Sequence, residues 1–412
     1  MKKIIICVLL ISALFGCTPK SSENGKEQPD NQTQEKSDSE YIKSVWLPYF
    51  ELEKMTKGNN EKRFTESAEK VFKEIKGSGF NAVTVQVRPC ADAFYRSDFF
   101  PSSKYCFGKQ ESDMPYDPLE IMCSLAKKLS LKLEAWINPY RVSRDNNIDS
   151  LCEGNIAKAW LKNSKKKSNV YIDKSGIFFN PASREVERLI VNGVSEIVKR
   201  YGVYSVHFDD YFYPTDKKKI DKKEYAQYFK EGGKLILSDW RRENVSRMVK
   251  SVYRAVKSVN KNVRFGISPA ADITNDREKL FADVERWVSE KGYVDYICPQ
   301  VYFGFKNVYQ PFMFTVKKWL YITKCDLFIG LPLYKAGKPD KYAAYDNKSI
   351  INEFKNNSNI IARQINYLSK LNEIKGFYIF SYYDFHTKEA KTEKENMLKA
   401  LNNKGQLQGC MK

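Results

Sequence analysis

The chain has 412 residues, of which 42% are hydrophobic and 14% aromatic, so it can bury one large core or two ordinary ones. Its formal net charge is +19, but the lysines are dispersed or clustered in short runs at 165–167 and 217–219, without a nucleic-acid-binding motif. We therefore exclude nucleic acid as its partner and expect either a solvated lysine-rich surface or attraction to anionic lipid or wall polymers.

The N-terminus has the parts of a secretory signal. Residues 1–3 carry positive charge, residues 4–15 are apolar, and Leu14-Phe15-Gly16-Cys17 ends this stretch with a small residue before a cysteine. The ending resembles a bacterial lipobox and predicts a lipoprotein signal peptide over 1–17 with lipidation of Cys17; an ordinary signal peptide with a chance cysteine is the alternative. Residues 18–40 are almost entirely polar and predict a flexible tether, which places the protein at the extracytoplasmic face of the cell membrane.

Residue counts argue against a metal centre or another cofactor. His207 and His386 are the only histidines, too few for a histidine-built site. Nine cysteines are present, but beyond Cys7 and Cys17 they are odd in number and lack CxxC spacing. Export would permit disulfides, although the spacing determines no pairing. No feature of the sequence indicates a protein partner.

From residue 41 onward, short apolar strands alternate with amphipathic helices. In the first helix, Phe64, Ala68, Val71, Phe72 and Ile75 fall on one face. The predicted strands are 44–50, 82–88, 132–138, 205–211, 264–269, 295–302, 327–333 and 376–382. Further helices are predicted at about 118–129, 185–200, 241–258, 279–290, 312–323, 360–372 and 388–401.

Eight such units predict an α/β fold, a (β/α)₈ TIM barrel, over residues 41–390, followed by a C-terminal helix and tail over 391–412. The loops after the strands are long, at 89–117, 139–184 and 212–240, as in barrels whose active site lies at the C-terminal face. A doubly wound open sheet is the alternative, but no glycine-rich phosphate loop follows any strand.

The most informative stretch is 205–214, which starts as a buried strand and ends in Asp209, Asp210 and a proline. Neighbouring side chains on a strand point to opposite sides, and two charges there are costly to desolvate unless they are paired or used. A capping aspartate beside a solvated one is the ordinary explanation. The surrounding aromatic residues favour a sugar-binding cleft instead.

Similar side chains end the other predicted strands. Aromatic faces stack on pyranose rings, and Asn, Gln and Arg bind hydroxyl and acetamide groups. The predicted substrate-binding residues are Arg88, Trp136, Asn138, Tyr140, Arg141, Tyr211, Tyr213, Gln300 and Tyr302. Other polar or aromatic residues at strand ends are Trp46, Tyr49, Gln86, Ser268, Asp272, Tyr334, Tyr382 and Asp384.

Several motifs together resemble the glycosyl hydrolase-like 10 family of bacterial surface proteins. They are Gln86-Val87-Arg88-Pro89, Ala93-Phe94-Tyr95-Arg96-Ser97, Tyr116-Asp117-Pro118-Leu119, Ala135-Trp136-Ile137-Asn138-Pro139-Tyr140-Arg141, Phe208-Asp209-Asp210-Tyr211-Phe212-Tyr213-Pro214, Asp239-Trp240-Arg241-Arg242-Glu243-Asn244-Val245, Gly266-Ile267-Ser268-Pro269 and Asp295-Tyr296-Ile297-Cys298-Pro299-Gln300-Val301-Tyr302. The resemblance implies a barrel and a glycosidase, with denuded peptidoglycan glycan as one substrate class.

The chain departs from the family pattern at three places. Position 134 is often His in such proteins and is Glu134 here, and residues 270–273 and 303–304 also differ. These changes bear on the preferred sugar more than on the reaction.

A glycosidase needs an acid and a second group at the anomeric carbon, and we assign the acid role to Asp210. With Tyr302, the Asp209–Asp210 pair resembles substrate-assisted hexosaminidases, in which Asp209 would orient the substrate acetamide. The competing mechanism takes its second carboxylate from Asp272 or Asp384. Two other functions remain open, a non-catalytic glycan-binding lipoprotein and an exported amidase or esterase, although no G-x-S-x-G motif supports the latter.

Overall fold

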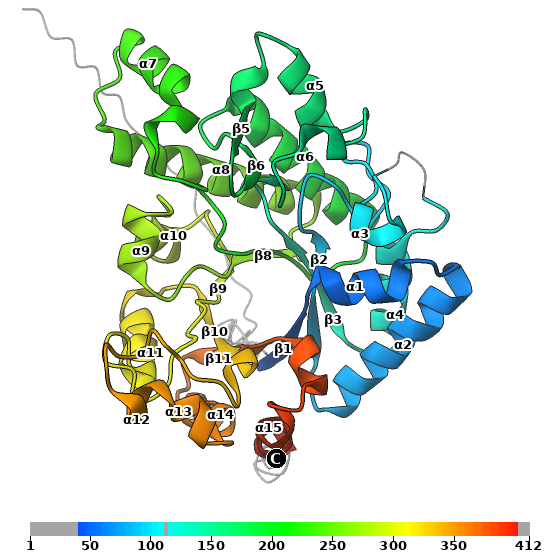
Figure 1. Ribbon diagram of the computed structural model, residues 1–412, viewed down its shortest axis with the longest axis vertical. Helices are drawn as coiled ribbons and strands as arrows, with labels where there is room; N and C mark the ends of the chain where they lie inside the picture. The colour runs from blue at the N-terminus through cyan, green and yellow to red at the C-terminus, as the bar shows by residue number, and fades with distance from the viewer. Residues whose placement is uncertain (1–39, 111–113, 403–412) are drawn as a thin grey trace, which may run out of the picture. The chain divides into compact units, whose positions relative to one another are not determined.

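The computed structural model describes residues 40–110 and 114–402, so the predicted signal peptide, the tether, Cys17 and the end of the C-terminal tail lie outside the described residues. Eight parallel strands close into a barrel in the order β1-β11-β10-β9-β8-β7-β3-β2, with helices around it (Figure 1). The strands are β1 (Ile42–Leu47), β2 (Ala82–Arg88), β3 (Lys132–Ile137), β7 (Ser205–Phe208), β8 (Arg264–Ile267), β9 (Tyr296–Ile297), β10 (Asp326–Pro332) and β11 (Ile374–Phe380). The predicted (β/α)₈ barrel is confirmed, and the open sheet is excluded because β1 pairs with both β2 and β11.

All predicted strands except the second run too far at their C-terminal ends. β7 ends at Phe208 rather than at Tyr211, and β9 has two residues. Beyond β9, Gln300 forms only isolated bridges, to Ala270 and Gly330. Aromatic and polar residues continue past each ladder because they line the rim of the barrel, which the composition alone does not distinguish from a strand.

The described residues have helices at all eight positions where the amphipathic patterns predicted one, and seven more that were not predicted. The helices are α1 (Tyr49–Thr56), α2 (Glu61–Gly77), α3 (Lys104–Phe107), α4 (Pro118–Lys128), α5 (Ile156–Lys162), α6 (Arg184–Arg200), α7 (Lys222–Lys230), α8 (Leu237–Val259), α9 (Ile273–Glu278), α10 (Val284–Ser289), α11 (Phe312–Ile322), α12 (Lys348–Ile351), α13 (Glu353–Asn356), α14 (Ile360–Leu368) and α15 (Lys391–Asn402). The helix predicted at 279–290 is shorter than expected. Phe281 has a φ of 52°, outside the helical region, so α10 begins only at Val284.

The loops at the C-terminal ends of the strands carry their own structure. After β3 the chain forms a small antiparallel sheet in the order β4-β6-β5, with β4 (Arg141–Ser143), β5 (Val170–Asp173) and β6 (Gly176–Phe179). After β7 it forms α7. The predicted long loops at this face are therefore present, and they build up one rim of the barrel.

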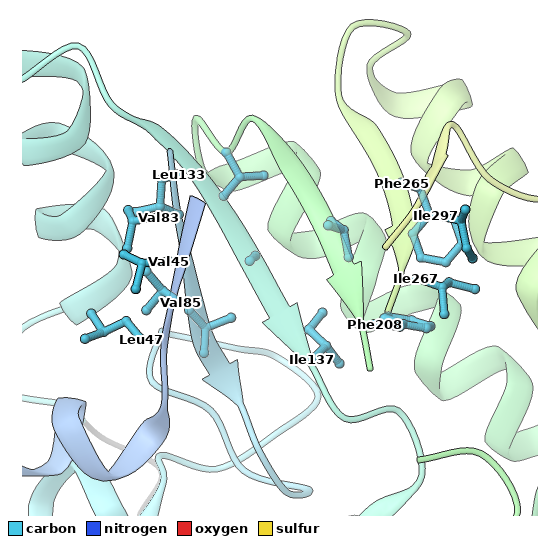
Figure 2. Close-up of a cluster of buried hydrophobic side chains, with 14 of the residues drawn as sticks. Val45, Leu47, Val83, Val85, Leu133, Ile137, Phe208, Phe265, Ile267 and Ile297 are labelled. Atoms are coloured by element: carbon cyan, nitrogen blue, oxygen red, sulfur yellow. The ribbon is translucent and has the colours of Figure 1, made fainter. Parts of the chain in front are cut away.

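The strands bury side chains on both of their faces. Figure 2 shows the outward set, in which Val45, Val83, Leu133 and Phe265 belong to the cluster that packs beneath the helices. Each such side chain is fully or almost fully buried, which contributes about 1.5–3 kcal/mol of transfer free energy per residue. Because strand residues alternate, the intervening side chains point into the barrel.

The inward set contains an unusual polar group, the carboxyl of Glu134. Thr84 Oγ1 and Tyr378 Oη donate to its two oxygens, at 2.6 and 2.8 Å. Burial holds the pKa of Glu134 above its usual value, and these hydroxyl donors oppose the shift. The family departure at this position is thus accommodated by a satisfied network inside the barrel, two residues before Trp136 on the same strand.

Candidate active site

A cleft of about 470 Å³ opens at the C-terminal ends of the barrel strands. It contains both predicted catalytic residues and five of the predicted substrate-binding residues. The side chains that line it are Trp46, Pro48, Tyr49, Phe50, Gln86, Trp136, Arg141, Arg144, Asp209, Asp210, Tyr211, Ser268, Gln300, Tyr302, Tyr334 and Phe380. Aromatic walls with a few convergent polar groups are typical of a carbohydrate site.

Asp209 is held rigidly on the floor of the cleft. Its Oδ2 accepts from Trp136 Nε1 at 3.1 Å and from Asn138 Nδ2, and its Oδ1 accepts from the Tyr211 backbone N–H at 3.3 Å. Gln86 Nε2 donates to Asn138 Oδ1 at 2.7 Å, which leaves the Asn138 amide nitrogen directed at Asp209. Three donors favour the ionised carboxylate and hold it in one orientation.

Asp210 lies beside it with fewer donors and more exposure. Gln300 Nε2 donates to its Oδ1 at 3.2 Å and is itself held by the Ser268 carbonyl at 3.0 Å. Burial raises the pKa of both carboxyl groups; for Asp209 the neighbouring charge of Asp210 adds to burial and brings the pKa to about 7, while Arg141 opposes the rise in both.

Two adjacent buried carboxyl groups lose their protons in separate steps, so one proton is retained near neutral pH. Three donors converge on Asp209 and one on Asp210, so hydrogen bonding favours the charged form at Asp209, whereas burial and the charge of Asp210 favour the protonated form there. Near neutral pH the pair therefore offers one carboxylate and one carboxylic acid side by side.

Two arginines carry positive charge into the same cleft. The Arg141 guanidinium lies over the Tyr211 ring, 4.1 Å from its centroid, and Arg144 donates to the Tyr49 hydroxyl. Tyr211 is 53% exposed, so this stacked pair forms an open wall beside Asp209 and Asp210. Such a cleft can hold a sugar ring against an aromatic face and accommodate an anionic substituent.

One protein family matches most of this chain, including nearly all of the cleft. The glycosyl hydrolase-like 10 family model matches residues 41–346, which include every residue of the cleft except Phe380. The chain belongs to the glycosyl hydrolase-like 10 family. Membership supports a glycosidase and confirms the resemblance drawn from the motifs.

The chain is also similar to curated proteins in sequence and to a solved structure in fold. The chain is 36% identical over 60% of its length to the glycosyl hydrolase YngK of Bacillus subtilis, and 34% identical over 64% of its length to the glycosyl hydrolase DigH of Escherichia coli. The match spans 51% of YngK and 64% of DigH, so the chain covers less than two thirds of either relative. The glycoside hydrolase domain of PgaB from Bordetella bronchiseptica superposes with a TM-score of 0.56 at 11% identity, covering 86% of this chain and 98% of that domain, which shows a shared fold.

Four predicted substrate-binding residues of this glycosyl hydrolase-like 10 chain do not line the cleft. Arg88 is buried against the Phe100 ring, 4.3 Å from its centroid, and Tyr213 is buried between Arg241 and Phe281. Tyr140 is also buried. Asn138 lies beneath Asp209 and positions it. Their strand-end positions predicted that these four side chains contact a glycan directly. Because they are buried and do not line the cleft, they are badly placed for that contact.

The alternative catalytic partners are engaged elsewhere. The Asp272 side chain accepts from the backbone N–H groups of Thr274 and Asn275 and caps α9. Asp384 accepts from the backbone and hydroxyl of Ser381 at 3.1 and 3.0 Å. Neither lines the cleft, so Asp272 and Asp384 are badly placed to act as the second carboxylate of a two-carboxylate mechanism.

Some lining residues escaped prediction. Phe380 is the last residue of β11, and Phe50 is the last residue of the predicted strand 44–50, so the strand-end reasoning could have found both. Arg144 carries no such signal, because it follows the small β4 strand inside a long loop. Only the folding of that loop over the barrel brings it to the cleft.

A third carboxyl group, Asp276, is buried close to the pair. It is fully buried in α9; its Oδ1 accepts from the Ala270 N–H at 3.2 Å, and its Oδ2 has no hydrogen-bond partner among the residues that the structure describes. Burial raises its pKa well above the usual range, and the charge of Asp210 adds to the rise. The folded protein therefore keeps Asp276 protonated at pH values where the unfolded chain, with a pKa of about 3.9, has lost that proton.

Asp276→Asn should accordingly gain in stability relative to the parent as pH rises. The raised folded-state pKa makes the parent lose stability above about pH 4, whereas Asn does not titrate. The difference in the free energy of unfolding, variant minus parent, should therefore be about 1–3 kcal/mol larger at pH 8 than at pH 4.5. Urea unfolding of both proteins at the two pH values measures this, with the exposed Asp346→Asn as a matched control. A stability difference independent of pH would contradict the ionisation argument.

Within 40–110 and 114–402, no group of three or more His, Cys, Asp and Glu side chains could hold a metal ion. The six cysteines in these ranges are free thiols. None of the helices described is both long and apolar enough to cross a membrane.

Proposed function

We propose that this protein is a membrane-anchored, extracytoplasmic glycoside hydrolase that cleaves N-acetylated cell-wall glycan, with peptidoglycan strands as the preferred substrate. The observation that carries the proposal is the Asp209–Asp210 pair on the cleft floor, one carboxylate fixed by three donors and the other free to hold a proton. Glycoside hydrolysis requires such an acid beside a second polar group at the anomeric carbon.

In the proposed mechanism the substrate supplies its own nucleophile. Asp209 accepts the acetamide N–H and directs the acetamide oxygen to the anomeric carbon, while Asp210 gives its proton to the departing glycosidic oxygen. Burial holds the pKa of Tyr302 well above its usual range, so its hydroxyl stays protonated and donates to the acetamide oxygen. Water, with Asp210 acting as base, then opens the cyclic intermediate.

Charge supports a cell-wall glycan over a neutral one. With Asp210 protonated, Arg141 and Arg144 outweigh the single charge of Asp209 among the ionisable side chains that line the cleft. A sugar that carries a carboxylate substituent complements that balance. Neutral glucans lack both the acetamide that Asp209 would orient and the carboxylate that the arginines would bind.

The test is product analysis. Purified protein is incubated with peptidoglycan glycan stripped of its peptides, and separately with neutral glucans, and the products are measured by mass. We expect shortened N-acetylated fragments from the first and intact polymer from the second. Binding to the stripped glycan without any cleavage would instead support a non-catalytic glycan-binding lipoprotein, because barrels can keep a cleft without the chemistry.

The proposed location is tested at Cys17. We expect the unaltered protein to fractionate with membranes, because a diacylated cysteine supplies enough buried hydrocarbon for stable anchoring. Cys17→Ser should release the protein or leave it unprocessed, as measured by fractionation and mass spectrometry of the N-terminus. Recovery of the unaltered protein wholly from the medium, cleaved and without lipid, would refute the anchor.

A further inference from the structure

Exposed apolar side chains gather on one part of the surface. Of the thirteen large hydrophobic residues that are exposed in the described chain, seven lie between positions 308 and 345. We call these seven the aromatic face: Val308, Tyr309, Met313, Phe314, Tyr321, Tyr342 and Tyr345. Tyr321 is 91% and Tyr345 95% exposed. Isolated surface apolar residues are ordinary, but a group of this size indicates an interaction site.

The members of the aromatic face belong to one region of the fold. Phe314 and Tyr321 are seven positions apart on α11 and therefore share its outer side, opposite the buried Phe312, Val316 and Trp319. The Val308 N–H donates to the Ala343 carbonyl at 3.0 Å. This bond joins the loop before α11 to the segment that carries Tyr342 and Tyr345.

Lysines lie among these aromatic residues. Lys317 and Lys318 fall between Phe314 and Tyr321 on the outer side of α11, and neither forms an ion pair with any described residue. The exposed lysines from 306 to 348 are Lys306, Lys317, Lys318, Lys324, Lys338, Lys341 and Lys348. Asp346 is the one exposed acidic residue in that range, so the exposed side chains of this segment are strongly positive.

We propose that the aromatic face docks on an anionic lipid bilayer. Tyrosine and phenylalanine favour the boundary between water and acyl chains, and lysines beside them bind anionic headgroups. A second copy of this chain fits poorly, because two such surfaces would repel each other. A soluble wall polyanion would use the lysines but would leave the aromatic side chains in water. α11 is too short to span a bilayer, so it would lie along the interface.

The test is vesicle co-sedimentation with the chain from residue 18 onward, which contains every strand and helix of the closed barrel and lacks the apolar signal stretch. Vesicles of phosphatidylglycerol with phosphatidylcholine are compared with vesicles of phosphatidylcholine alone. We expect binding to the anionic vesicles that weakens as salt rises, because exposed charges are screened. No binding to the anionic vesicles would overturn the proposal.

Paired variants separate the two contributions. Lys317→Gln with Lys318→Gln should weaken binding about tenfold or more, since each lysine near an anionic surface contributes about 1 kcal/mol. Phe314→Ser with Tyr321→Ser should weaken it severalfold at unchanged charge. Lys62→Gln with Lys70→Gln, on the exposed side of α2, is the matched control and should bind like the parent. Binding that depends on the lysines but not on the aromatic pair would overturn the lipid assignment in favour of a polyanion.

Discussion

Asp210→Asn should lower glycan turnover by about 10²–10⁴-fold and leave glycan binding measurable. The amide keeps the shape of the side chain, and its carbonyl oxygen can still accept from Gln300 Nε2, but it has no proton of the required acidity for the leaving oxygen. Initial rates on N-acetylated glycan give the loss in turnover. Calorimetric titration with the same glycan shows whether the cleft still binds.

The design of this experiment separates chemistry from folding. Asp216→Asn removes an exposed carboxylate from the loop that follows Asp210 and should act like the parent. A substrate with an acidic phenol as leaving group needs little protonation, so Asp210→Asn should lose much less activity on it. Full activity of Asp210→Asn on natural glycan would remove the catalytic assignment altogether.

Turnover should also require an N-acetyl group beside the scissile bond. If the acetamide is the nucleophile, a glucan with a hydroxyl at that position lacks the reacting group, and its rate should fall to background. A thiazoline mimic of the cyclic intermediate should bind at least about 10²-fold more tightly than the parent sugar, as expected for an analogue of the reacting state. Inhibition constants for the two compounds measure this.

The Asp209→Asn variant tests whether Asp209 orients the substrate acetamide. Its amide would present a donor to the acetamide N–H in place of an acceptor, or would break the bonds from Trp136 and Asn138. The thiazoline should therefore lose its advantage in this variant. Comparable rates on glucan and on N-acetylated glycan would rule out substrate assistance and require a second protein carboxylate, a role for which Asp272 and Asp384 are badly placed.

Local patterns were enough to predict the barrel. Near-continuous apolar runs identified all eight strands, because barrel strands are covered on both faces, and β2 matches its predicted bounds. Of the predicted helix stripe, Phe64, Ala68, Phe72 and Ile75 are buried in α2 as expected, and Val71 is partly buried. The same patterns extended most predicted strands past their observed C-terminal ends, because aromatic residues are common both in strands and in the wall of the cleft.

The sequence by itself determined where the proposed catalytic pair lies, since Asp209 and Asp210 follow β7 and all barrel strands end at one face. Only the tertiary structure decided which neighbouring side chains face the cleft. Gln86 and Arg88 share parity on β2, yet the register shifts between them against β3, so Gln86 lines the cleft and Arg88 is buried beside Phe100. Arg144 reaches the cleft through the fold of a long loop. Alternation along a strand is a local property, whereas bulges and loop paths depend on packing against distant segments, and no stretch of sequence contains that information alone.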